Sequence, residues 1–396
     1  QLVAIQAIGA LVLGLSASQL GVVQASILLP ALFLMLPAGV TAENNDGRKI
    51  LIWAQALAFF PALFLGILTL TKWITFPHLI MYGLLIGALG SFVMPARDAL
   101  LSHIVDNAKI QRAVNIALSL QFTGMLCGMV VVSGADFVDI GWMPILQAVV
   151  YLIAAYVSAR LPKNLANTPK KMTSLGKTIP EMIDGIRISF AHKDIAPVLL
   201  IQFGISICFI GMFMVILPLF VRDYYGGGAG DIALLNMLFW VGTIVAMVTL
   251  IRLGLIPAVG KMLLGGVSTG LLIVGALAVP KPFWALACLC VVWGIAAGCS
   301  MSSGRTIIQN RAPDSHRARI LSVYQFSFMG GAPFGALLTG LVADRFGVHA
   351  APLFSMAVMG VILLSVGIFS QLRFVRLSED ELENVEATTR LDSSAD

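Results

Sequence analysis

The chain has 396 residues, of which 58% are hydrophobic and only 11% are charged, and its mean hydropathy is +0.93. A soluble domain carries roughly 25% charged and about 45–50% apolar residues, so this composition excludes a soluble globular protein. The apolar runs are continuous rather than alternating, which favours membrane-spanning helices over the strands of a transmembrane barrel. The net charge of +5 is assigned to membrane topology, and no nucleic-acid partner is expected.

Twelve apolar segments follow one another along the chain, and each can form a helix that crosses the membrane. The first, at residues 1–17, starts within apolar sequence and is expected to be a truncated helix. The remaining segments are 19–42, 49–71, 78–101, 112–134 and 141–161 in a first set, then 195–220, 231–253, 259–279, 282–304, 318–342 and 349–373 in a second. The predicted fold class is therefore all-α integral membrane, with twelve transmembrane helices in two pseudo-equivalent six-helix bundles.

The domain organisation follows from this division. An N-terminal bundle at 1–161 and a C-terminal bundle at 195–375 are joined by a cytoplasmic central loop at 162–194, and an acidic tail at 376–396 is expected to be disordered. Within the loop, residues 173–193 predict an amphipathic helix on the membrane surface, because apolar side chains recur there at helical spacing beside basic ones.

The basic residues predict the orientation. If the polar turn at 43–49 is cytoplasmic, 21 of the 25 Lys and Arg residues lie on the cytoplasmic side. The four on the opposite, external side are Lys72, Arg222, Lys281 and Arg345. This asymmetry satisfies the positive-inside rule. We therefore expect a multi-pass protein of a bacterial inner membrane, with its central loop in the cytoplasm.

The two halves show signs of a duplication. An offset of 207 residues places Arg112 on Arg319, Gly124 on Gly331 and Gly128 on Gly335. These positions lie in the fifth and eleventh segments, which predicts that the two bundles superpose about an axis along the membrane normal. Duplicated bundles of this kind hold a substrate near the midplane, between the halves.

The turn after the second segment carries a family resemblance. Gly39, Ala42, Glu43, Gly47, Arg48 and Lys49 resemble the signature turn of the major facilitator superfamily, Gly-x-Leu-Ala-Asp-Arg-x-Gly-Arg-Arg/Lys. The chain departs from that pattern at Thr41, Glu43 and Asn44, and it has one extra residue before Gly47. "VMPARDALLSHIVDNAKIQRAVNIA", "NRAPDSHRARILSVYQF" and "GGAPFGALLTGLVADRFG" resemble the bacterial branch that contains the enterobactin exporter and related drug exporters.

The resemblance implies a secondary active transporter. It would export a small amphipathic molecule, such as a siderophore, drug or metabolite, by alternating access and ion-gradient-driven antiport, with H⁺ as the coupling ion. The fifth segment, which in many antiporters ends Gly-Pro-x-x-Gly-Gly, retains Gly124 and Gly128 but has Met129 at the proline position. A lysophospholipid flippase on the same fold and a non-transporting membrane sensor or enzyme remain as alternatives.

Four groups of candidate functional residues follow. The predicted conformational latch consists of Gly39, Glu43, Asp46, Gly47, Arg48 and Lys49. The predicted cytoplasmic gate consists of Arg97, Asp98, Arg112, Arg305 and Arg319. The predicted substrate cavity is lined by the polar and aromatic side chains Gln24, Gln121, Gln202, Asn236, Trp240, Trp293 and Gln325. Gly124, Gly128, Gly331 and Gly335 are predicted to allow close helix packing. For the charged residues, capping and snorkelling at helix ends are the alternative interpretation; for the amides and tryptophans it is helix packing.

No pattern in the sequence points to catalysis. The five histidines form neither a His-x-x-x-His nor a Ser/His/Asp arrangement, and no phosphate-binding loop is present. We therefore expect no enzyme activity, no cofactor and no metal site. The expected partners are the small-molecule substrate, the coupling ion and membrane lipids, and the protein is expected to be a monomer.

Overall fold

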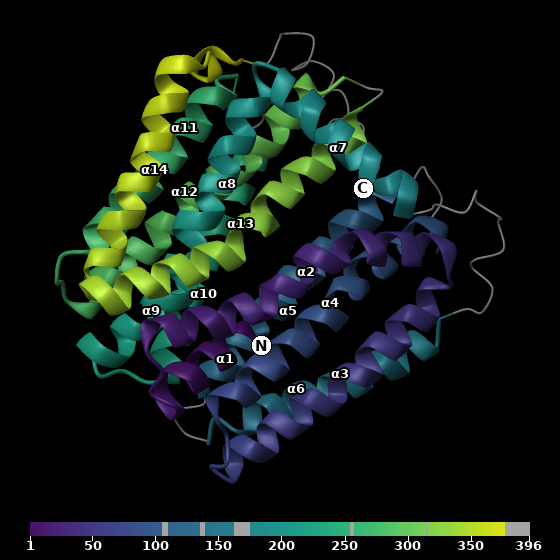
Figure 1. Cartoon of the computed structure of the whole chain (residues 1–396), viewed down its shortest axis with the longest axis vertical. Helices are drawn as coiled ribbons and strands as arrows, with labels where there is room; N and C mark the ends of the chain where they lie inside the picture. Colours follow the sequence, from purple (N-terminus) through teal and green to yellow (C-terminus); the bar gives the residue numbers. More distant parts are fainter. Residues whose placement is uncertain (105–109, 135–138, 162–174, 254–256, 314–315, 377–396) are drawn as a thin grey trace. The chain divides into compact units, whose positions relative to one another are not determined.

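The computed structural model describes residues 1–104, 110–134, 139–161, 175–253, 257–313 and 316–376, and every regular element in those ranges is a helix (Figure 1). The first half contains α1 (Leu2–Ala7), the π-helix η1 (Ile8–Val12), α2 (Ala17–Asn44), α3 (Gly47–Leu70), α4 (Phe76–Ile104), α5 (Ile110–Ser133) and α6 (Trp142–Ala159). After α7 (Leu175–Ala191) the chain forms α8 (Ile195–Gly211), η4 (Met212–Ile216), α9 (Leu217–Leu219), η5 (Phe220–Tyr224) and α10 (Ala229–Leu253). The last elements are α11 (Val259–Leu277), α12 (Phe283–Arg311), α13 (Arg317–Phe346), α14 (Ala350–Phe369) and η6 (Leu372–Phe374).

These helices confirm the predicted fold class. Among the described residues, ten helices are long and apolar enough to span a membrane, and two shorter apolar helices lie at Leu2–Val12 and Leu120–Ser133. Each falls on one of the twelve apolar segments of the sequence. Several helices run past the apolar limit, as α12 does to Arg311, because hydropathy marks only the part of a helix that lies in hydrocarbon.

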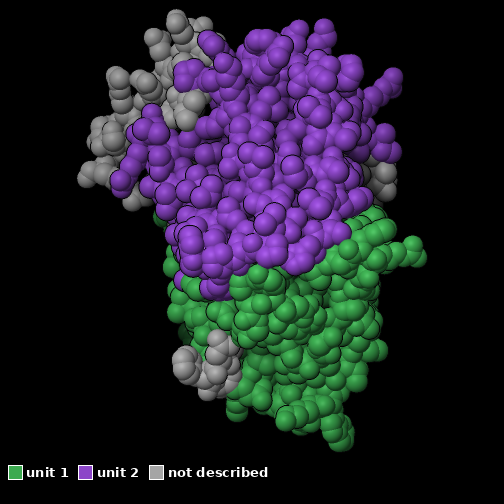
Figure 2. Space-filling view, turned by 90° about the vertical axis from the view of Figure 1, so that its left-hand side faces the viewer, with its two compact units in different colours: residues 1–181, 213–234, 332–348 green, residues 182–212, 235–331, 349–396 purple. Residues whose placement is uncertain are grey.

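The contacts divide the chain into two compact units, which Figure 2 colours separately. Unit 1 consists of Gln1–Glu181, Phe213–Leu234 and Ala332–Val348, and unit 2 of Met182–Met212, Leu235–Gly331 and His349–Asp396. Unit 1 thus also takes in segments from the second half of the sequence: most of η4, all of α9 and η5, the start of α10 and the end of α13. The division into an N-terminal and a C-terminal bundle at 161 and 195 stays a prediction.

Unit 1 is built on α2, α3, α4 and α6. Helix α4 packs against both α2 and α3, and α3 also packs against α6. Their shared core contains Val23, Leu65, Leu79, Tyr82 and Ala148. Because the core faces of these helices are satisfied by one another, the remaining apolar side chains are left to face lipid.

Local capping explains where α2 and α3 begin. The Ser16 hydroxyl accepts the N–H of Gln19, and the Gln19 side chain accepts the N–H of Ser16, which is a capping box at the start of α2. The Asp46 carboxylate accepts the N–H of Arg48 at 3.0 Å and starts α3 in the same way. Asp46, one of the predicted latch residues, therefore has a structural role at a helix start.

The predicted loop helix is present as α7. Within unit 2, its Gly185 lies against Arg319 and Val323 of α13, and Ser189 is fully buried. Its Ile183 and Phe190 side chains are exposed. The position of α7 on the membrane surface stays a prediction.

Candidate functional site

Helices α2 and α13 approach one another closely within unit 1. A Cβ atom added to Gly21 would lie 2.5 Å from the carbonyl oxygen of Ala336, and one added to Gly340 would lie 2.4 Å from that of Ala17. Real Cβ atoms do not approach a backbone oxygen so closely, so glycine is required at both positions. The pairings Ala17–Gly340 and Gly21–Ala336 also show that the two helices run antiparallel.

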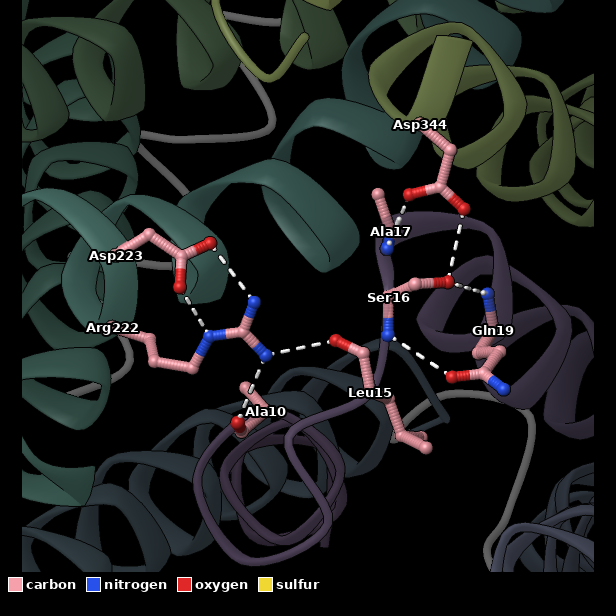
Figure 3. A network of polar contacts seen from close by, with 8 residues as sticks. All are labelled: Ala10, Leu15, Ser16, Ala17, Gln19, Arg222, Asp223 and Asp344. Atoms are coloured by element: carbon pink, nitrogen blue, oxygen red, sulfur yellow. Dashed lines mark hydrogen bonds and ion pairs between the residues drawn. The ribbon is translucent and has the colours of Figure 1, made fainter.

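The Asp344 carboxylate sits on the N-terminus of α2 (Figure 3). Its Oδ1 accepts the N–H of Ala17 at 2.9 Å, and its Oδ2 accepts the Ser16 hydroxyl at 2.9 Å and the N–H of Ser18 at 3.0 Å. The first N–H groups of a helix have no partner within the helix, and the helix dipole favours a negative charge there. Asp344 therefore binds α2 through charge-assisted hydrogen bonds.

Arg222 makes the complementary contact at the end of η1. Its Nη1 donates to the carbonyl oxygens of Ala10 at 3.1 Å and of Leu15 at 2.8 Å, while Nη2 pairs with Asp223 Oδ2 at 2.9 Å (Figure 3). Carbonyl groups at the end of a helix lack partners within it, so a guanidinium is well suited to them. Both Ala10 and Arg222 lie in π-helical segments, which are frequent at functional sites.

We call these contacts the external clasp: Asp344 on Ser16, Ala17 and Ser18, and Arg222 on Ala10 and Leu15. The charge asymmetry of the sequence predicts that this end of the helices lies on the external side of the membrane. A carboxylate and a guanidinium from distant parts of the sequence thus hold the connection between η1 and α2 from both sides. These charged groups are partly exposed, so the clasp can open without stranding a buried charge.

The sequence interpretation missed the clasp. Arg222 was one of only four basic residues on the external side, and Asp344 lies in the quoted stretch "GLVADRFG", but neither was chosen as a candidate. A charge on the side that the positive-inside rule depletes is a usable signal, because it needs another reason to be there.

Gln24 lies deeper in unit 1, on the same face of α2. Ala17, Gly21 and Gln24 are spaced at i, i+4 and i+7, so the Gln24 position continues the face that Gly21 turns towards α13. Its side chain is 0% exposed, and neither its Nε2 nor its Oε1 has a hydrogen-bond partner among the described residues. Gln6 on α1, which is 1% exposed, likewise has an unpaired Oε1 within the described part of the chain.

The other predicted cavity residues fall into different settings. Gln202, Asn236 and Trp293 are buried in unit 2, where the Trp293 ring packs edge-on against Phe209 at 6.1 Å and Phe239 at 5.6 Å between ring centroids. The same Phe239 ring also packs edge-on against the half-buried Trp240. Gln121 and Gln325 are exposed. The seven side chains are distributed over two units, and a common cavity for them stays a prediction.

Two of the predicted gate residues form a cluster with a predicted cavity residue. Arg97 pairs with Asp98 at 3.0 Å, and its Nη1 donates to Gln121 Oε1 at 2.9 Å. Arg319 pairs with Asp184 of α7 at 3.2 Å, a partner that the sequence interpretation did not choose. Arg305 is exposed on α12, and the Arg112 side chain lies outside the described part of the structure.

Two of the predicted latch residues, Gly47 and Arg48, hold the start of α3 against other helices of unit 1. Arg48 Nη2 donates to the carbonyl oxygen of Ala159 at 2.6 Å, and a Cβ on Gly47 would lie 3.0 Å from the carbonyl oxygen of Ala96. Lys49 is exposed, and Gly39 has open space around it among the described atoms. The Glu43 side chain lies outside the described part. A latch function for this turn stays a prediction.

The four predicted packing glycines differ in their surroundings. A Cβ on Gly331 would lie 2.9 Å from the Ser206 side chain, and Gly335 is buried. Gly124 and Gly128 are exposed, with nothing within 4 Å of an added Cβ among the described atoms. The packing role of this set also stays a prediction.

Comparison with known proteins identifies the family. Residues 1–394 match the model of a family described as transmembrane secretion effector. The multidrug efflux pump Tap of Mycobacterium tuberculosis is 24% identical over 85% of this chain and 81% of its own length. The staphyloferrin A transporter of Staphylococcus aureus is 23% identical over 84% of this chain and 83% of its own.

The fold has close counterparts among solved structures. A variant of the nucleoside transporter NupG superposes with a TM-score of 0.73, at 15% sequence identity, over 92% of this chain and 94% of that one. Identity this low supports a common fold and nothing about the transported molecule. The chain therefore belongs to the transmembrane secretion effector family of membrane transporters, which confirms the predicted relation to bacterial exporters of the major facilitator superfamily.

Proposed function

We propose that this protein exports a small amphipathic molecule across the bacterial inner membrane by alternating access, driven by H⁺ antiport. The observation that carries the proposal is the external clasp, the contacts of Asp344 and Arg222 with the connection between η1 and α2, which we propose to be a closure that opens during transport. The names of the relatives, a multidrug efflux pump and a staphyloferrin A transporter, support the export of small molecules.

The clasp has the energetics that alternating access requires. A charge at a partly exposed helix end contributes about 0.3–1 kcal/mol, and an exposed ion pair about 0–1 kcal/mol. The sum is small enough for a bound ligand to overcome, provided that the ligand binds the open state more tightly than the closed one. With the clasp closed, a substrate reaches its site from the cytoplasm; with the clasp open, the substrate leaves to the outside.

Gln24 is the side chain that we propose for substrate contact in unit 1. An amide buried without hydrogen-bond partners destabilises the protein by about 1–3 kcal/mol, and in the closed state the Gln24 amide is such a group. When α2 and α13 separate, a ligand or water can pair with this amide. The other cavity candidates, Gln121, Gln202, Asn236, Trp240, Trp293 and Gln325, are proposed to complete the binding surface. An amphipathic ligand would pair its polar group with the amides and its apolar part with the indole rings.

For proton coupling we propose the cluster of Arg97, Asp98 and Gln121. Asp98 is a carboxylate held by a guanidinium near the cytoplasmic end of α4, so protonation of Asp98 would release Arg97. The chain is also proposed to act as a monomer and as a transporter without enzyme activity; its match to a transporter family over residues 1–394 supports the second of these proposals.

Transport in proteoliposomes tests the proposal. The purified protein is reconstituted, and the efflux of a panel of macrolides, siderophores and cationic dyes is measured with and without an imposed pH gradient. We expect at least one compound to move only with the gradient, and the Asp98→Asn variant to lose that dependence while the Asp139→Asn variant, at an exposed external carboxylate, retains it. Absence of gradient-dependent transport for the whole panel would contradict the proposal.

A further inference from the structure

Helices α3 and α4 leave an apolar groove on their outer face, with a volume of about 450 Å³. Its walls include Phe60, Phe64 and Ile67 of α3 and Met81 and Leu85 of α4, all of them substantially exposed. Exposed apolar side chains in a membrane-spanning helix face lipid hydrocarbon. The groove is therefore open to the bilayer, and lipid acyl chains can enter it.

The floor of the groove is rigid. Tyr82, which is 2% exposed, donates from its hydroxyl to Gln147 Oε1 at 3.1 Å, and Gln147 Nε2 donates to the Tyr151 hydroxyl at 3.1 Å. This chain of hydrogen bonds links α4 to α6 beneath the groove. The cavity is therefore preformed, as ligand sites usually are, and does not depend on mobile side chains.

A hydrogen-bond donor lies at the external end of the groove. His78 lines the groove, and its Nδ1 accepts the backbone N–H of Thr75 at 3.2 Å. A neutral imidazole that accepts at Nδ1 carries its hydrogen on Nε2. In the described part of the chain that Nε2–H has no protein acceptor, so it is available to a polar group at the head of an apolar ligand.

The turn between α3 and α4 places a cation and a tryptophan beside this end. Lys72 is exposed and has a φ of 59°, which a non-glycine residue rarely adopts, and Trp73 is 77% exposed. Tryptophan is typical of the headgroup level of a membrane, and lysine there attracts phosphate. Asp139 precedes the start of α6, which packs against the end of α3, but no ion pair joins it to Lys72 among the described residues.

We propose that this groove binds one acyl chain of a phospholipid from the external leaflet, whose ester or phosphate oxygen accepts the His78 Nε2–H and whose phosphate faces Lys72. The dimensions fit one leaflet: from Leu68 to Phe60 the groove descends ~12 Å along α3, less than half of a hydrocarbon core about 30 Å thick. The site is separate from the external clasp and does not require the proposed transport activity.

Photo-crosslinking tests the site. The full chain is placed in nanodiscs of phosphatidylglycerol and phosphatidylethanolamine that contain a trace of phospholipid with a diazirine on its acyl chain, and labelled peptides are mapped by mass spectrometry. We expect the label to concentrate on residues 60–68 and 78–85. Lys72→Gln should lower this labelling about threefold, whereas Lys281→Gln, which removes another external positive charge, should not.

Two substitutions at His78 separate ligand binding from helix capping. His78→Asn keeps an acceptor near the Nδ1 position for the Thr75 N–H and removes the Nε2–H, whereas His78→Gln places an amide donor near the Nε2 position. We expect labelling of the groove to fall in His78→Asn and to be largely retained in His78→Gln. Two results would overturn the proposal and show that the groove holds only exchanging bulk lipid. One is equally strong labelling of all lipid-facing helices. The other is labelling of the groove at the level of the unmodified protein in the Lys72 variant and in both His78 variants.

Discussion

Asp344 Oδ2 accepts the Ser16 hydroxyl at 2.9 Å, although 328 positions separate the two residues in the sequence. Ser16 is also the N-cap of α2, so the same hydroxyl serves both the capping box and the clasp. The start of α2 is thereby ordered twice, once by its own sequence and once by α13. Opening the clasp removes the second restraint and leaves the first, so α2 can move as an intact helix.

Removing the Asp344 charge should favour opening on the external side. Asp344→Asn retains an acceptor oxygen but loses the charge–dipole attraction, which is worth up to about 1 kcal/mol and corresponds to about a fivefold larger open population. Labelling from outside of a cysteine introduced at Ala25, in a background without the five native cysteines, measures that population. Arg345→Gln, at the neighbouring exposed charge, is the matched control. Slower labelling in Asp344→Asn than in the unmodified protein would contradict the clasp.

Arg222 should not be replaceable by lysine. Its guanidinium reaches two carbonyl oxygens and the Asp223 carboxylate at once, whereas an ammonium cannot reproduce that planar arrangement. Arg222→Lys and Arg222→Gln should both increase labelling at Ala25, by about threefold to tenfold, from the loss of hydrogen bonds worth about 0.5–1.5 kcal/mol.

Asp223→Asn serves as the control for the Arg222 variants, since it leaves both carbonyl contacts intact and should have a smaller effect. A double variant that combines Arg222→Gln with Asp344→Asn provides a further test. Because Arg222 and Asp344 both hold the segment 10–18, the effects of the two substitutions on labelling at Ala25 should be non-additive.

The α2–α13 crossing should not tolerate a methyl group. Gly21→Ala and Gly340→Ala each place a Cβ within about 2.5 Å of a backbone oxygen, and forcing the helices apart costs about 1–3 kcal/mol. Both variants should lower the thermal stability of the purified protein and raise labelling at Ala25. Gly124→Ala, where the described atoms leave open space, is the control and should change neither measurement. Wild-type stability in Gly21→Ala would mean that the two helices are already apart in the resting protein.

The sequence predicted the helices well and the clasp not at all, and the reason is physical. A membrane-spanning helix is specified locally, by about 20 consecutive apolar residues, so its position can be read from hydropathy. The contact of Asp344 with the start of α2 depends on how distant segments pack, which no local pattern encodes. The motif at 43–49 consists of consecutive residues, so it can be recognised in the sequence. The predicted latch was therefore placed there, on the cytoplasmic side.

Gln24 is an intermediate case. A polar amide within an apolar span stands out in the sequence, and it was predicted as a functional residue on that basis. Its burial without a partner is known only from the packing of unit 1. Gln121 looks the same in sequence but is exposed and accepts a hydrogen bond from Arg97. Gln24 and Gln121 thus differ in the free-energy cost of placing their amides in the fold, and the difference comes from the neighbouring helices rather than from their own.

Replacing Gln24 by leucine should stabilise the closed protein and impair transport. Leucine has a similar volume, so it fills the same space while removing two unpaired polar atoms that together cost about 1–3 kcal/mol. The midpoint of thermal unfolding should therefore rise and labelling at Ala25 should fall, because the open state loses its advantage of pairing the amide with water or ligand. Ser26→Ala is the matched control on the same helix: the Ser26 hydroxyl already donates to the carbonyl oxygen of Val23 at 2.7 Å, so its removal should not stabilise the protein. A lower unfolding midpoint in Gln24→Leu would show that the resting protein satisfies this amide, and Gln24 would then be a packing residue rather than part of the transport path.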